Sequence, residues 1–152
     1  MAKFLMCAIL ILQNLFGVNV EMEWKELFEV SNKIVVYNNG VEKVIGAQDT
    51  LFETILKAMN MVNEGGHEMP ALGVALDNEV RESLKTGLWI EFWYAETVEH
   101  NQMPFDRLLV EVVPDYMGYN LIRHFDGEYG GRCFYMSLDG DMTRLFESIQ
   151  NI

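Results

Sequence analysis

The sequence has few cysteines and little charge, and both shortages exclude classes of protein. Its two cysteines, Cys7 and Cys133, are too few and too far apart for the disulfide framework of a small secreted domain. We therefore expect a reducing, cytoplasmic environment. Charged residues make up 22% of the 152 residues and apolar residues 50%, which is enough to build a continuous core. This composition excludes a disordered or low-complexity chain.

Basic residues are scarcer than acidic ones. Eleven lysines and arginines stand against 23 acidic residues, which gives a formal net charge of −12. The bases are scattered singly, whereas nucleic-acid binding relies on clustered lysines and arginines that displace counterions. Nucleic acid is therefore excluded as the main partner. A basic partner protein or a cationic small molecule fits this charge, and so does a simple contribution to solubility.

The sequence also lacks the spacings that mark metal, nucleotide and catalytic sites. Its three histidines, His67, His100 and His124, do not form the paired spacings of zinc ligands. No phosphate-binding loop, dinucleotide fingerprint or nucleophile elbow is present. We therefore predict no metal and no cofactor. Cys133 with His124 as its base is the one nucleophilic pair to consider, although Cys133 lies in a strand-like run where cysteine usually serves as a small apolar residue.

Residues 1–21 form an apolar N-terminal segment with three interpretations. Lys3 followed by the run 4–12 resembles a signal peptide, but no small-residue cleavage site follows and the run is short for a membrane span. The segment is otherwise an N-terminal element of the fold or an extension upstream of a true start at Met22. We favour the last two interpretations and expect no stable membrane insertion, while secretion stays open.

The first half of the folded part is predicted to contain helices and one hairpin. Residues 22–31 have helical apolar spacing, and residues 34–45 form two strands around an Asn-Asn-Gly turn. Thr50 and Glu53 match a capping box, which predicts that a helix over 50–64 begins at this point.

The second half is predicted to be a four-stranded antiparallel meander followed by a helix. A short helix beginning at Asp77 or Asn78 precedes it, and Asp139 or Asp141 caps the last helix. Turn-rich links too short for parallel crossovers separate the strands, which are 88–97, 106–113, 119–125 and 132–138. Residues 22–152 are thus predicted to be a single α+β domain, with the helices covering one face of the meander.

Alternation along the strands places an unusual set of side chains on the other face. Apolar residues such as Ile90 and Phe92 fall on the core face. The opposite face combines tryptophans with charges, which suits either a small-molecule platform or ordinary cross-strand pairing that completes a sheet. The candidate binding residues are Trp89, Glu91, Trp93, Arg107, Glu111, Arg123, His124 and Arg132.

Two loops, 67–73 and 100–105, each contain a histidine followed by a Met-Pro step. Such loops serve as contact surfaces or pack on each other, and we favour packing. Because no catalytic set emerges, the leading hypothesis is a non-enzymatic, acidic binding or regulatory protein of the inhibitor or immunity type, which blocks a basic partner. The alternative is a small hydrolase or transferase with a pocket on the sheet face.

Overall fold

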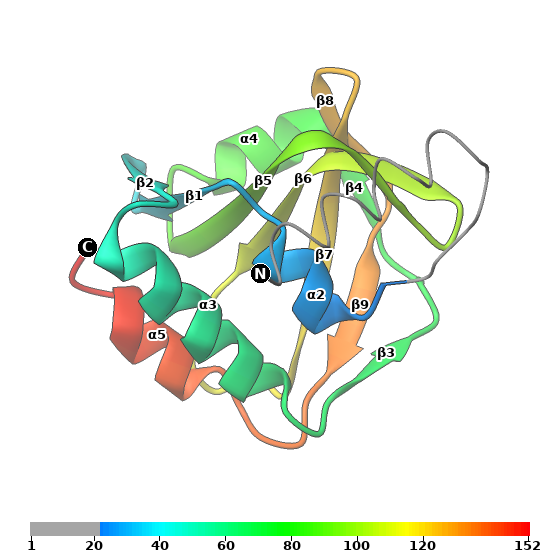
Figure 1. The fold of residues 1–152 in the computed structure, drawn as a ribbon. Coiled ribbons are helices and arrows are strands. Elements are labelled where there is room, and N and C mark those ends of the chain that lie inside the picture. The colour runs from blue at the N-terminus through cyan, green and yellow to red at the C-terminus, as the bar shows by residue number, and fades with distance from the viewer. Residues whose placement is uncertain (1–21) are drawn as a thin grey trace.

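An antiparallel sheet of nine strands, accompanied by four helices, makes up residues 22–152, the part of the chain that the computed structural model describes (Figure 1). The predicted α+β class is confirmed, but the predicted four-stranded meander understates the size of the sheet. The interpretations of residues 1–21, including Cys7, lie outside the described residues. The strands are β1 (Lys33–Asn38), β2 (Val41–Gly46), β3 (His67–Met69), β4 (Val74–Leu76), β5 (Leu88–His100), β6 (Met103–Glu111), β7 (Gly118–Phe125), β8 (Glu128–Arg132) and β9 (Phe134–Ser137).

The predicted hairpin is part of the same sheet as the meander. Its turn residues Asn39 and Gly40 both have positive φ, as this tight turn requires. β1 pairs with β2 on one side and with β5 on the other, so that Tyr37 lies opposite Trp89. The strand order is β2-β1-β5-β6-β7-β8-β4, with β9 pairing to β7 and β3 pairing to β9. The sequence alone did not reveal this long-range pairing.

The last predicted strand, 132–138, corresponds to β9, and most of β8 lies in what was predicted to be the preceding turn. Cys133 separates β8 from β9, and its amide donates to the carbonyl of Gly73 instead of continuing the ladder with β7. The segment 67–76, which contains the predicted loop 67–73, supplies the partners of β8 and β9, because β3 pairs with β9 and β4 pairs with β8. β3 and β4 have three residues each, which is too short for a visible alternation.

The four helices are α2 (Trp24–Glu29), α3 (Thr50–Asn63), α4 (Asp77–Ser83) and α5 (Thr143–Ile149). The predicted capping box of α3 was wrong by one residue, since Asp49 is the N-cap and its carboxylate accepts from the amide of Leu51 at 2.9 Å. At α5 the carboxylate of Asp141 accepts from the amide of Thr143, and this bond lowers the pKa of Asp141. Among these helices none is long and apolar enough to cross a membrane.

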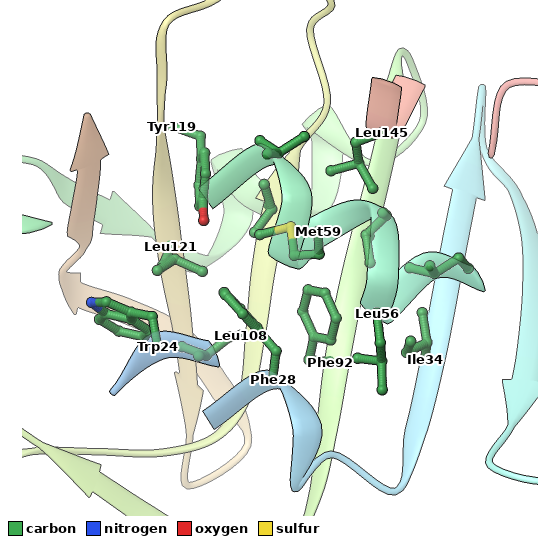
Figure 2. Close-up of a cluster of buried hydrophobic side chains, with 14 of the residues drawn as sticks. Trp24, Phe28, Ile34, Leu56, Met59, Phe92, Leu108, Tyr119, Leu121 and Leu145 are labelled. Carbon is green, nitrogen blue, oxygen red and sulfur yellow. The ribbon is translucent and has the colours of Figure 1, made fainter. Parts of the chain in front are cut away.

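The main core lies between one face of the sheet and helices α2, α3 and α5 (Figures 1 and 2). Phe92 and Leu108 of the sheet meet Phe28 of α2 and Met59 of α3, and all four side chains are completely buried. The predicted alternation of the core face is correct here, since Ile90 and Phe92 point to this side.

The other face carries a second, smaller core, so the expectation that the helices cover one face only was wrong. Val80 of α4 and Tyr129 of β8 pack there against Trp89 and Leu109. Figure 1 shows α4 on the side of the sheet away from α3 and α5. As a result Trp89 has 5% of its surface exposed and Glu91 none.

Candidate functional site

A large cleft, called the larger cleft below, lies between α2, α3 and β3. It has a volume of about 1220 Å³. Its apolar lining includes Leu56, Met136 and the indole of Trp24, which are buried. Its charged lining among residues 22–152 consists of two lysines and five glutamates, namely Lys25, Lys57, Glu23, Glu29, Glu53, Glu64 and Glu68. The cleft therefore combines apolar side chains with an excess of negative charge.

Glu68 of β3 is the fixed carboxylate of this cleft. Its Oε2 accepts from Trp24 Nε1 at 2.9 Å and lies 2.8 Å from His100 Nε2. Its Oε1 accepts from Asn101 Nδ2 at 2.9 Å. These contacts join β3 to α2 and to the β5–β6 turn, and the ring of Trp24 lies 4.5 Å from that of His100. Glu68 thus connects the two Met-Pro loops by hydrogen bonds to His100 and Asn101, which agrees with the prediction that the loops pack on each other.

Glu91 forms the centre of a second hydrogen-bond network, on the opposite face of the sheet. Its Oε2 accepts from Tyr37 Oη at 3.0 Å and Trp93 Nε1 at 2.7 Å, and its Oε1 accepts from Tyr129 Oη at 2.5 Å. All three donors are neutral, and they come from β1, β5 and β8. A polar residue on the second face is therefore buried because three donors converge on it.

Trp93 lies between two cations. Lys33 Nζ is 3.3 Å from its ring centre and Arg107 Cζ is 3.5 Å away. Both are its direct cross-strand neighbours, on β1 and β6. Cross-strand pairing was the predicted structural explanation of the second face, but the pairs expected there were of glutamate with arginine, whereas these pairs join Trp93 to cations.

The remaining predicted residues fall into separate places. His124 is buried, with Nδ1 2.5 Å from Asp106 Oδ1 and its ring against that of Tyr129. Arg123 lies on the opposite side of β7, where its guanidinium donates to the carbonyls of Pro104 and Arg132. Burial lowers the pKa of Arg123 and raises that of the Cys133 thiol, which disfavours a reactive thiolate.

Trp89 and Glu111 line a smaller cleft of about 390 Å³. They lie opposite each other on β5 and β6. Tyr116 and Tyr135 line the same cleft, from the β6–β7 loop and from β9. Of the eight predicted residues, the structure thus brings Trp89 together with Glu111, and Glu91 together with Trp93 and Arg107.

Sequence reasoning missed Trp24, Glu68 and Tyr129, which hold the two networks together. The Met-Pro loops did point to Glu68 and His100, but nothing in the sequence indicated that Trp24 reaches them. Within the described part of the chain, no group of three or more histidine, cysteine or acidic side chains is placed to hold a metal ion.

Four of the six tyrosines are held in their neutral form. Burial raises the pKa of Tyr94 and Tyr119 well above the ordinary value of 10.0. Burial and then the neighbouring charge of Glu91 do the same for Tyr37 and Tyr129. The folded state therefore resists ionisation of these hydroxyls, whereas the unfolded chain does not.

We expect this difference to produce a cooperative alkaline unfolding. A raised pKa stabilises the fold fully below the ordinary value of 10.0, and the stabilisation is lost as the pH rises above it. Tyrosinate absorbance and circular dichroism, followed together above pH 10.0, should change in one transition for these four residues. Combining Tyr37→Phe and Tyr129→Phe should make this alkaline transition depend less steeply on pH. A gradual ionisation of all six tyrosines in a folded protein would contradict the burial described.

The comparisons with known proteins assign no relative from which residues could be carried over. The chain matches no protein-family model, no curated protein and no solved structure to which it was compared. Its function therefore has to be argued from its own clefts and charges.

Proposed function

We propose that the protein is a non-enzymatic binding protein that holds a basic segment of a partner protein in the cleft between α2, α3 and β3. An inhibitor or immunity protein that blocks a basic partner is the sharper form of this proposal. The observation that carries it is the combination, in one cleft of about 1220 Å³, of an apolar lining and an excess of carboxylates.

The negative charge of the cleft favours a positively charged partner. Glu23 and Glu64 are exposed at the cleft and attract a basic segment that approaches it, and the net charge of −12 has the same sign. An acidic partner would be repelled by both. Complementary charge mainly accelerates association and rejects wrong partners, which is what an inhibitor of a basic protein requires.

The apolar part of the cleft supplies contact area for the same partner. The exposed side chain of Met61, on α3, lies at the cleft together with the buried Leu56 and Met136. Methionine adapts its shape to a partner at little cost. A segment that alternates basic and apolar side chains therefore matches the cleft better than a purely basic one.

The hydrogen bonds of Glu68 prepare the cleft for binding. Because Trp24, His100 and Asn101 hold this carboxylate from separate elements, its position does not have to be fixed when a partner arrives. A prearranged site loses less conformational entropy on binding.

Charge reversal at the cleft tests the proposal. The probe is a short amphipathic peptide of lysine and leucine, titrated calorimetrically at physiological ionic strength. The variant Glu23→Lys/Glu64→Lys should bind it about tenfold more weakly or worse, since both changes place positive charge beside a positive ligand.

A control variant with the same net charge separates the cleft from the charge of the whole protein. Glu42→Lys/Glu79→Lys reverses two exposed glutamates, on β2 and on α4, that do not line this cleft. It should bind the peptide within about twofold of the unmodified protein, because at physiological ionic strength screening limits the reach of exposed charges to about 8 Å. Equal weakening by the two variants would refute the cleft as the site.

A further inference from the structure

We propose that the smaller cleft, beside Trp89 and Glu111, binds a small molecule that carries a trimethylammonium group. This site is independent of the larger cleft. It lies on the second face of the sheet, and its volume of about 390 Å³ falls in the range of small-molecule sites.

The lining of the cleft is rich in aromatic side chains. Trp89, Tyr116 and Tyr135 reach the cleft from β5, from the β6–β7 loop and from β9. Tyr116 is 62% exposed, an unusual position for a large ring without a partner to cover it. Several rings around one space are the arrangement that attracts a quaternary ammonium ion, because the ring faces are negative and the ion is weakly hydrated.

Glu111 supplies a carboxylate to the same cleft. Glu111 is exposed, and within residues 22–152 no lysine or arginine forms an ion pair with it or lines the cleft. A Cβ placed on Gly87 would lie 3.5 Å from Trp89 Nε1 and 3.7 Å from Glu111 Oε1, so both groups lie close to this glycine. The cleft thus offers one carboxylate, and Trp89 is its direct cross-strand neighbour.

The mostly apolar lining favours a methylated cation over a primary ammonium group. A primary ammonium keeps three strongly hydrated N–H donors, whereas the residues that line the cleft, apart from Glu111 and Asn120, are aromatic, aliphatic or glycine. A trimethylammonium group has no donors and gives up little hydration when it enters between rings. Rings with one carboxylate therefore favour the methylated cation.

Glycine at position 118 shapes the cleft. A Cβ there would lie 2.3 Å from Tyr135 Oη and 2.8 Å from the carbonyl oxygen of Met136. The hydroxyl end of Tyr135 thus lies directly against the backbone of β7. A larger residue at this position would displace the ring from the cleft.

The test compares choline with 3,3-dimethyl-1-butanol, which has the same shape without the charge. Both are titrated into the ¹⁵N-labelled protein and followed by amide chemical shifts. Choline should shift amides of β5, the β6–β7 loop and β9, and the neutral alcohol should shift them little. Equal shifts by both compounds, or choline shifts confined to other elements, would overturn the proposal.

Matched variants identify the groups responsible. Glu111→Gln and Tyr116→Leu should each weaken choline binding by about fivefold or more, the effect of losing a charge or a ring face. Tyr116→Phe keeps the ring and should bind like the unmodified protein. Because Tyr116 and Glu111 are exposed, these variants should fold normally, which circular dichroism checks. Unchanged affinity in both Glu111→Gln and Tyr116→Leu would refute the site.

The same chemical group has two sources, a free molecule and a methylated lysine of a protein. A peptide that contains one trimethyllysine, titrated in parallel, distinguishes them. We expect choline to bind at least as tightly, because the cleft is sized for a small molecule. Binding of the peptide alone would overturn the assignment to a free molecule.

Discussion

Phe92→Asp is expected to abolish the folded state at neutral pH. The ring of Phe92 is fully buried and lies 4.8 Å from that of Phe28. Truncating such a ring costs about 3–5 kcal/mol, and an unpaired carboxylate in its place adds a large desolvation penalty. A typical domain has about 5–15 kcal/mol of stability to lose. Circular dichroism should show an unfolded chain without any denaturant.

Phe92→Leu is the matched control for this variant. It retains much of the apolar area and introduces no charge, so its cost should be well below the roughly 3–5 kcal/mol of a full truncation. The leucine variant should unfold cooperatively in urea. A folded Phe92→Asp protein with a midpoint close to that of Phe92→Leu would show that position 92 does not lie in the core.

Glu91→Leu should lower the free energy of unfolding by about 2–4 kcal/mol, although it removes a charge from the interior. The substitution leaves the hydroxyls of Tyr37 and Tyr129 and the indole N–H of Trp93 without their acceptor. The buried Tyr129 hydroxyl left unpaired costs about 1–3 kcal/mol. The half-buried Tyr37 and Trp93 donors cost less because water can reach them, and the relief of the carboxylate's own desolvation offsets part of the sum. Urea unfolding monitored by circular dichroism measures the difference.

Removing the donors as well should restore part of the loss. In the Glu91→Leu background, Tyr37→Phe and Tyr129→Phe eliminate two of the unpaired hydroxyls, and stability should rise. The same two substitutions should destabilise the unmodified protein, because Glu91 then loses two of its donors. A triple variant that is weaker by the simple sum of the separate costs would show that these groups do not interact.

Positions 91 and 92 illustrate how far the sequence was informative. Alternation correctly assigned them to opposite faces of β5, because the side-chain period of a strand is a local property. It did not reveal that both faces are covered. Glu91 is buried because Tyr37 and Tyr129 reach it from distant parts of the chain. Local patterns in one sequence carry no information on which distant residues will form hydrogen bonds to each other.

The errors within individual elements have similar physical causes. The strand predicted over 132–138 is interrupted at Cys133, whose amide bonds to Gly73 across the sheet edge. The capping box at Thr50 was plausible, but Asp49 is an equally good cap and takes the position. The larger cleft was missed because its fixed carboxylate, Glu68, is positioned by Trp24 and His100.

The position of β1 inside the sheet has a consequence for synthesis of the chain. Residues 33–38 pair with 41–46 at once, but their other edge waits for residues 88–93. Until β5 leaves the ribosome, the side chains of Ile34, Val35 and Val36, buried in the finished fold, have no neighbouring strand on that side. The nascent N-terminal half therefore exposes the unpaired edge of β1, to which other strands can pair. Folding is completed only late, when β5 has been synthesised.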